Sequence, residues 1–288
     1  MAPGPPTAAT GPPTAASGPH TAVKLELLVR YLDFWTPTAL GSGRRATYLD
    51  RSEYGAAAAV PVFAEFADLL TGRGLQVLVD GPLPTDPGIE GLRIAAAPAD
   101  PATALGGGHV FAHLAGGADG GLLATVGGLR TGELMLVTGP QPGDPRQRLY
   151  QAGFGYAVAV EMVDDAGAVE LLRFGTSRLR HLERFKEELW AVDEFAGIRY
   201  RDPGEPRAAL LDISMEPHPG PLRRALLARL GAEGAQSVTA LREYALVRTL
   251  YRPGDVPRAL SPLFARGALV REPEHRRLTG DTTVKLAR

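Results

Sequence analysis

Cysteine is absent from this chain of 288 residues. Without a thiol the protein can form no disulfide, no cysteine nucleophile and no cysteine-ligated zinc or iron–sulfur centre. Long apolar runs are also missing, since no stretch reaches the length of about 18 residues that a membrane-spanning helix needs. The N-terminus lacks the basic region and apolar block of a signal peptide. We therefore expect a cytoplasmic protein.

Charge is missing from the first part of the chain. Residues 1–22 contain no Lys, Arg, Asp or Glu, and a Gly-Pro-rich unit repeats within them. A segment of this composition cannot bury enough apolar surface to offset the entropy lost on ordering. The sequence predicts a disordered tail over residues 1–22. Beyond it, the 44% apolar and 22% charged residues of the whole chain are ordinary values for a globular protein.

Residues 23–205 alternate helical patterns with short apolar runs. Apolar residues at three- and four-residue spacing predict a helix from Val23 that Pro37 ends, a second over residues 56–70 and a third over residues 178–192. The near-continuously apolar runs are typical of a parallel sheet covered on both faces. These strands are expected within residues 44–50 and over 75–79, 92–96, 109–114 and 133–137, before an antiparallel pair over 156–163 and 169–174. The fold class predicted is α/β, with an open Rossmann-like sheet.

Residues 206–288 predict a second, smaller unit. Helix, short strand, helix, turn, helix and two strands follow one another, in the order of a winged helix. From residue 221 onward, 13 Lys and Arg stand against 6 Asp and Glu, although the whole chain has a formal net charge of −1. The last helix and the wing would present basic side chains to DNA. The candidate nucleic-acid-binding residues are Arg258, Arg266, Arg271, Arg276 and Arg277. Because winged helices also dock proteins, a protein partner is the alternative.

The turn after the first strand is the place where such a sheet would bind a nucleotide-like cofactor. A cofactor loop needs several glycines, so that backbone N–H groups can approach the ligand. Only Gly55 stands in this turn, behind the bulky residues 51–54. Acids after the strands could hold a nucleoside, although Asp at a strand end is also a common turn or helix-cap residue. The candidate cofactor-binding residues are Asp50, Gly55, Asp80 and Asp100.

Two histidines, His109 and His113, share one face of a predicted strand, as a pair of metal ligands would. No Glu accompanies them as in the helical motif of zinc hydrolases. We therefore expect ordinary packing or solvent-facing histidines and no metal site. The chain also lacks a nucleophile elbow and a phosphate loop ending in Gly-Lys-Ser/Thr, which excludes the corresponding hydrolases and nucleoside triphosphatases.

Two blocks of the sequence resemble the three-Cys-motif partner proteins. The blocks are KLELLVRYLDFW (24–35) followed by TYLD (47–50), and LLRFGTS (171–177) followed by FKEELWAVD (185–193). Members of this family look like class I S-adenosylmethionine methyltransferases with a C-terminal winged helix. The resemblance therefore implies this fold and S-adenosylmethionine as the cofactor.

The chain departs from the family pattern at the cofactor loop. Members continue the first strand with Asp, an aromatic residue, Ala, Gly and Gly, whereas Asp50 is followed by Arg51-Ser52-Glu53-Tyr54. The fourth strand ends in HLAGG (113–117) where members have an Asp-Pro type motif. Our leading hypothesis is a degenerate, non-catalytic methyltransferase-like protein that binds a nucleic acid or a protein through its winged helix. The alternatives are an active methyltransferase with a remodelled loop, in which Asp80 holds the ribose and Asp50 the methionine end, and a sheet reused for another small molecule of a biosynthetic pathway.

Overall fold

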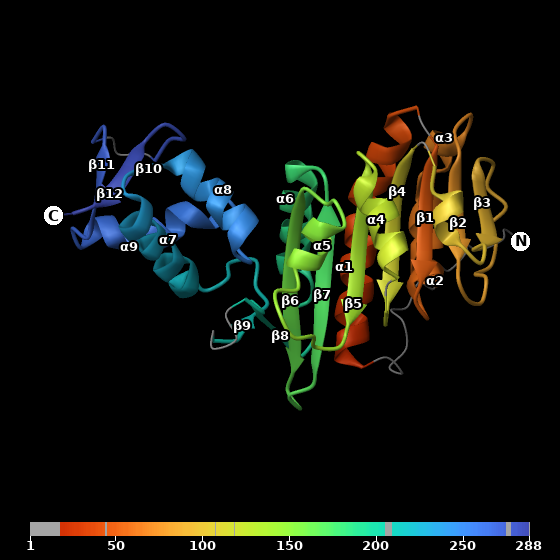
Figure 1. Ribbon diagram of the computed structural model, residues 1–288, viewed down its shortest axis with the longest axis horizontal. Helices are drawn as coiled ribbons and strands as arrows, with labels where there is room; N and C mark the ends of the chain where they lie inside the picture. Colours follow the sequence, from red (N-terminus) through yellow and green to blue (C-terminus); the bar gives the residue numbers. More distant parts are fainter. Residues whose placement is uncertain are drawn as a thin grey trace, which may run out of the picture.

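The computed structural model describes residues 18–43, 45–106, 108–117, 119–204, 209–274 and 278–287. Within these residues, a nine-stranded sheet with the order β3-β2-β1-β4-β5-β7-β6-β8-β9 forms the larger part of the molecule (Figure 1). The strands are β1 (Ala46–Arg51), β2 (Leu75–Val79), β3 (Leu92–Ala96), β4 (His109–Ala115), β5 (Gly132–Thr138), β6 (Tyr156–Asp164), β7 (Val169–Thr176), β8 (Ile198–Arg201) and β9 (Leu211–Asp212).

The strand directions define the fold class. β1 to β5 are parallel, and β7 lies antiparallel between β5 and β6. A doubly wound sheet that starts 3-2-1-4-5 is Rossmann-like, and here an antiparallel strand, β7, is inserted between β5 and β6. The predicted fold class is confirmed, as is the antiparallel pair at residues 156–174.

Helices cover both faces of the sheet (Figure 1). One face packs against α1 (Pro19–Gly41), α2 (Gly55–Glu65), α3 (Ala67–Leu70) and α6 (Leu179–Ala191). The other face packs against η1 (Pro101–Ala104), α4 (Gly120–Gly128) and α5 (Gln147–Gln151). Because successive side chains of a strand point to opposite faces, Tyr48 lies in the first core and Leu49 in the second.

Helix α1 differs from its prediction at both ends. It begins at Pro19, so residues 19–22 form its first turn, whereas the sequence predicts a tail there; residues 1–17 lie outside the described part of the chain. It also runs through Pro37 to Gly41, which corrects the predicted end at Pro37. A proline costs the helix one hydrogen bond, but Trp35, Ala39 and Leu40 on either side are fully buried in the core. This packing holds the last turn in place.

Two further expectations are corrected. The helix predicted over residues 56–70 is divided at Phe66, whose non-helical backbone separates α2 from α3. The sheet also extends beyond residue 205, the predicted end of the first unit, because β9 follows β8 and continues the sheet to Asp212. Strands of four and two residues are too short to show a reliable apolar alternation, which explains why the sequence pattern misses them.

The C-terminal unit follows the predicted order of elements. It contains α7 (Gly220–Glu233), β10 (Gln236–Ser237), α8 (Val238–Arg248), α9 (Asp255–Ala265), β11 (Leu269–Glu272) and β12 (Thr283–Leu286), with the strands paired antiparallel in the order β10-β12-β11. It lies at the β8–β9 end of the large sheet (Figure 1). Its apolar residues, such as Leu226 and Leu263, belong to the same buried cluster as Trp190 and Tyr200 of the sheet domain. The two parts therefore share one core.

Among the described residues, each helix is too short or too polar to span a membrane.

Candidate functional site

Asp50 is the next-to-last residue of β1, at the point where strand order reverses between β1 and β4, the place where ligands bind in sheets of this kind. Its carboxylate is buried, with the residue only 1% exposed. Oδ1 accepts from the Ser52 hydroxyl at 2.8 Å and lies 2.9 Å from Nδ1 of His113, and Oδ2 accepts from the Ala56 N–H at 2.5 Å. Since a carboxylate can only accept, the geometry places a proton on Nδ1 of His113.

The same contacts close the N-terminus of α2. Ser52 accepts from the Gly55 N–H at 2.9 Å, and Asp50 takes the next N–H, that of Ala56. Free N–H groups at a helix N-terminus are what an anionic group of a ligand would bind. Two of those donors are here satisfied by side chains of the chain itself.

Gly55 makes room for protein side chains. A Cβ at this position would lie within 3.0 Å of Nδ1 of His113, Oδ1 of Asp50 and Oγ of Ser52. In a cofactor loop, glycine allows the backbone to approach the ligand. In this chain the space beside Gly55 is taken by the Asp50–Ser52–His113 cluster.

Asp80 follows β2 and pairs with the loop residue Arg51. Nε of Arg51 donates to Oδ2 of Asp80 at 2.8 Å, and the side chains are 34% and 51% exposed. The backbone N–H of Asp80 also donates to the Asp50 carbonyl, which holds the two candidate acids side by side. An exposed pair of this kind contributes only about 0–1 kcal/mol, so another ligand could replace Arg51.

Asp100 follows β3 and has a local role. Its side chain caps η1 by accepting from the Ala102 N–H at 3.1 Å, and it is exposed. The structure therefore brings together Asp50, Gly55 and Asp80 of the four cofactor candidates.

The two histidines do not form a metal site with other residues. His109 begins β4 and His113 lies near its end, and both are buried. No group of three or more His, Asp or Glu side chains in the described residues could hold a metal ion.

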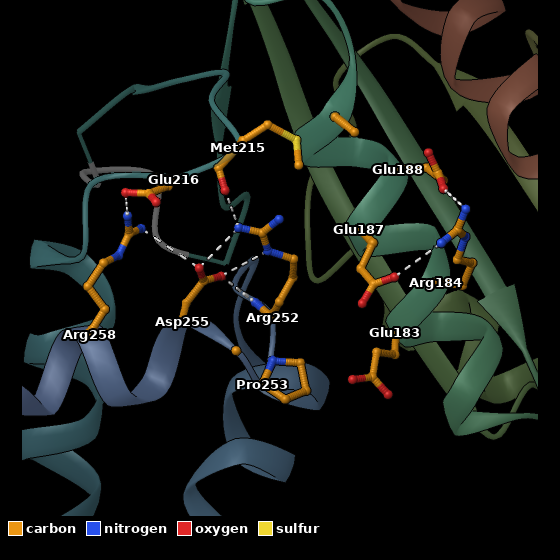
Figure 2. Close-up of a pocket in the computed structure, with 12 residues that line it drawn as sticks. Glu183, Arg184, Glu187, Glu188, Met215, Glu216, Arg252, Pro253, Asp255 and Arg258 are labelled. Carbon is orange, nitrogen blue, oxygen red and sulfur yellow. Dashed lines mark hydrogen bonds and ion pairs between the residues drawn. The ribbon is translucent and has the colours of Figure 1, made fainter. Parts of the chain in front are cut away.

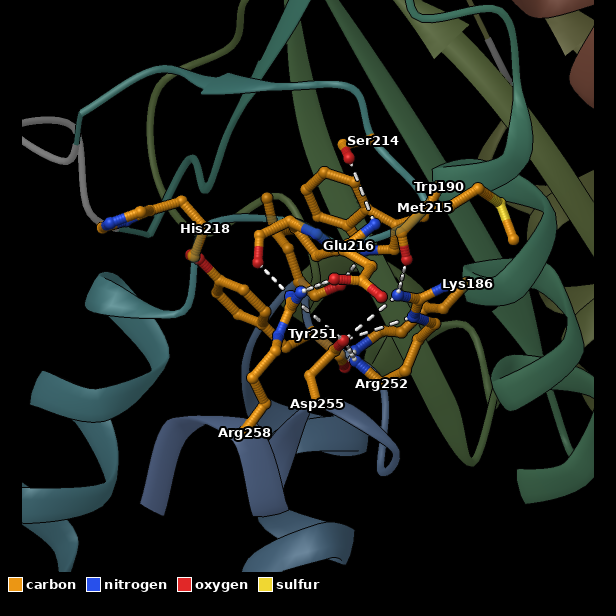
Figure 3. Close-up of polar contacts among 12 residues, drawn as sticks. Lys186, Trp190, Ser214, Met215, Glu216, His218, Tyr251, Arg252, Asp255 and Arg258 are labelled. Carbon is orange, nitrogen blue, oxygen red and sulfur yellow. Dashed lines mark hydrogen bonds and ion pairs between the residues drawn. The ribbon is translucent and has the colours of Figure 1, made fainter. Parts of the chain in front are cut away.

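The basic candidates of the C-terminal unit have different surroundings. Arg258 of α9 faces the segment between β9 and α7, where it donates to Glu216 at 3.0 Å and to the Pro217 carbonyl (Figure 3). Arg271 stacks over the Phe264 ring at 5.2 Å, and Arg266 is exposed at the end of α9. Arg276 and Arg277 lie outside the described residues.

The junction of the two parts is centred on Lys186 of α6, whose residue is fully buried (Figure 3). Its ammonium donates to backbone carbonyls where α8 ends; the acceptors are Ala245 (3.3 Å), Leu246, Thr249 and Tyr251 (3.2 Å). Burial lowers the pKa of Lys186 to about 7. One turn further along α6, Nε1 of Trp190 donates to the Leu250 carbonyl at 2.9 Å. These two side chains fix the C-terminal unit to the sheet domain.

A cleft of about 510 Å³ opens beside this junction, between α6 and the start of α9 (Figure 2). Five carboxylates and three arginines line it, so the lining has an excess of negative charge. Arg184 pairs with Glu188 on α6, while Arg252 donates to Asp255 at 3.1 Å on the opposite wall. Because each of the three arginines is paired with an acid, the cleft does not favour an anionic ligand.

Sequence reasoning missed three of the residues that shape these sites. Ser52 stands in the run 51–54, where only bulk and charge are evident, and its bond to Asp50 depends on the turn geometry. His113 is visible only as half of a histidine pair. Lys186 lies in the FKEELWAVD block, where a lysine among apolar helical positions was the one available signal of burial.

No protein-family model and no curated protein matches the sequence. Among solved structures, the crystal structure of EvdMO1 is 16% identical, with a TM-score of 0.33; the match covers 60% of this chain and 52% of that chain, so this chain spans about half its length. The N-terminal domain of EvdMO1 with SAH bound is 12% identical over 52% of this chain and 81% of that chain, with a TM-score of 0.34. A mutant form of MtNAS in complex with S-adenosylmethionine is 16% identical over 51% and 62% of the two chains, with a TM-score of 0.24. These similarities are low, so the fold assignment rests on the strand order.

Proposed function

We propose that this protein is a methyltransferase-like binding protein that does not hold S-adenosylmethionine in the usual position. The buried Asp50 carboxylate carries this proposal, because Ser52, His113 and the Ala56 N–H already use its oxygens. The residues present do not fit the cofactor in this arrangement, since the chain fills the space beside Gly55 itself. We also propose that the chain is related to the three-Cys-motif partner proteins and that its C-terminal unit is a winged helix like theirs.

Calorimetric titration with S-adenosylmethionine and S-adenosylhomocysteine tests this. We expect no binding tighter than about 1 mM, which corresponds to about −4 kcal/mol, because a ligand would first have to break the Asp50–Ser52–His113 cluster. Micromolar binding, about −8 kcal/mol, would contradict the proposal and would direct attention to a methyl acceptor.

A remodelled, active methyltransferase is the second candidate. The exposed Arg51–Asp80 ion pair favours it, since ribose hydroxyls could displace Arg51 at little cost. In that case Asp80→Ala would weaken S-adenosylmethionine binding at least tenfold, whereas Asp86→Ala, which removes an exposed acid of the following loop, would not.

We propose that the binding partner contacts the C-terminal unit. The excess of basic residues in this unit supports a nucleic acid as that partner. Arg258 is engaged with Glu216, so Arg266 and Arg271 are the two predicted candidates in the described residues that remain available to phosphates. A protein partner is the alternative for the same surface.

Fluorescence anisotropy with duplex DNA tests the nucleic-acid version. We expect Arg266→Ala/Arg271→Ala to lower affinity about tenfold and to reduce the salt dependence, since two phosphate contacts are removed. Arg199→Ala, which removes a charge from β8, is the control and should change little. If the protein shows no DNA binding, the nucleic-acid version is wrong and a protein partner remains.

A further inference from the structure

A second cavity lies at the edge of the sheet opposite Asp50, where the parallel strands begin. It encloses about 690 Å³ and is formed where the loop before β5, the loop before β6 and the turn between β7 and α6 meet. Its lining includes Ser42, Arg130, Thr131, Ser177 and Arg178. Close backbone packing shapes it, since a Cβ on Gly127 would overlap the Ala152 carbonyl of the neighbouring loop.

Arg130 and Arg178 distinguish this cavity from the other charged regions of the molecule. Elsewhere the chain pairs many of its arginines with acids, as in Arg51–Asp80, Arg201–Glu161 and Arg252–Asp255. Neither Arg130 nor Arg178 has an ion-pair partner in the described residues, and no acid is among the residues that line the cavity. Two guanidinium groups that share a concave site without a carboxylate favour an anion.

Glu133, an acid at the start of β5, does not neutralise them within the cavity. Its residue is 1% exposed, and its carboxylate is held on the α1 side of the sheet. There it accepts from the Tyr31 hydroxyl and lies 2.7 Å from Nδ1 of His181. Burial and the Glu133 carboxylate together raise the pKa of Tyr31, while the charge of Arg178 opposes this shift, so the tyrosine keeps its proton as a donor. The Glu133 carboxylate is thus bound to Tyr31 and His181 in the core.

The charge of this edge extends beyond the cavity. Arg45 precedes β1 and Arg180 follows Ser177 and Arg178 at the start of α6; both are exposed and have no ion-pair partner among the described residues. Toward β2 and β3 the same edge carries Asp68, Arg73 and Glu90, so charges of both signs are present there. The cavity lies in the section around β4, β5 and β7, and no acid is among its lining residues.

We propose that this cavity binds a phosphate-bearing anion. Arg130 and Arg178 would hold the phosphate oxygens, and the Ser177 hydroxyl, which has no partner in the described residues, would supply a further donor. The volume is much larger than one phosphate needs and lies within the range of sites for nucleotide-sized ligands. The phosphate could belong to such a small molecule or to a nucleic-acid backbone. Both sources need the same two arginines.

Calorimetric titration of the full chain with pyrophosphate tests the site at low ionic strength. We expect measurable binding that Arg130→Gln and Arg178→Gln each weaken at least tenfold. Arg73→Gln removes an exposed arginine that precedes β2 and does not line the cavity, so it should leave binding unchanged. Thermal unfolding of each variant shows whether the fold is intact. Ser177→Ala removes a hydroxyl but no charge, so it should weaken pyrophosphate binding less than either arginine variant.

Titration with a short single-stranded oligonucleotide distinguishes the two sources. Oligonucleotide binding that is lost in the Arg130 and Arg178 variants, and is retained in Arg266→Ala/Arg271→Ala, assigns the backbone phosphate to this cavity. Binding of pyrophosphate alone assigns a small phosphate-bearing molecule. Absence of binding by both probes, or binding that the Arg130 and Arg178 variants do not weaken, would overturn the proposal, and neither result depends on the S-adenosylmethionine titration.

Discussion

Lys186→Met is expected to destabilise the protein by about 2–4 kcal/mol, because it leaves buried backbone carbonyls without their donor. Methionine keeps most of the side-chain volume, so the loss reports the Lys186 amino group and its hydrogen bonds more than packing. The carbonyls belong to the end of α8 and the residues after it. Chemical denaturation measures the change. Since Lys186 joins the two parts, limited proteolysis should also release the C-terminal unit more readily.

The effect of Lys186 should depend on pH. Burial lowers its pKa to about 7 from an ordinary value of 10.5, with Asp202 and Asp255 opposing the shift and Arg146 adding to it. Between these values the unfolded chain binds a proton that the folded chain has lost, so this group makes the free energy of unfolding rise with pH. The difference in stability between the wild type and Lys186→Met should therefore grow from pH 7 toward pH 10.

Lys24→Met is the matched control. Lys24 pairs with Glu170 at 2.7 Å at the surface of α1, with side chains 19% and 33% exposed. Removing a pair of this kind costs about 1 kcal/mol or less, and the difference should not rise between pH 7 and 10. Equal effects of the two variants would mean that the carbonyl cluster around Lys186 contributes no more than an ordinary surface pair.

Gly55→Ala should cost about 1–3 kcal/mol, the range for overpacking a tight site. The added methyl would overlap Asp50, Ser52 and His113, which hydrogen-bond to one another in a buried cluster and so cannot all move away freely. Urea denaturation gives the stability change. The His113 ring resonances in an NMR spectrum should shift, since the ring must leave its position beside Asp50.

Gly120→Ala is the control for Gly55→Ala. Gly120 is also the first residue of a helix, α4, and a Cβ there would have nothing within 4 Å. Because its backbone is compatible with alanine, we expect no loss and a small gain from the lower entropy of the unfolded chain. If Gly55→Ala were equally harmless, the cluster would be loose enough to rearrange, and the remodelled methyltransferase would become the better interpretation of the site.

The strands of the parallel sheet could be predicted because they are buried on both faces. LQVLV in β2 and ELMLV in β5 are apolar apart from Gln76 and Glu133, so the burial of these strands is evident from consecutive residues. The ends of elements depended instead on tertiary contacts. Helix α1 continues past Pro37 because Ala39 and Leu40 pack in the core, and local propensity contains no information on that packing.

The sequence predicts where the candidate site lies but not the contacts within it. The end of β1 follows from the fold, and Asp50 and Asp80 indeed lie side by side there. What the sequence could not indicate is that Ser52 turns back to Asp50 while His113 reaches it from β4, a residue 63 positions away. Long-range polar contacts of this kind follow from the register of β1 on β4, which pairs Asp50 directly with His113.

The extension of the sheet by β8 and β9 limits how the protein can be dissected. A cut at the predicted boundary near residue 205 would separate β9 from β8, to which it pairs through Arg199 and Tyr200. The remaining fragment would expose an unpaired strand edge, which is a template for intermolecular association, and the apolar surface of Trp190 that Tyr251 now covers. Aggregation of such a fragment would reflect this exposed edge and not an intrinsic inability of the sheet to fold.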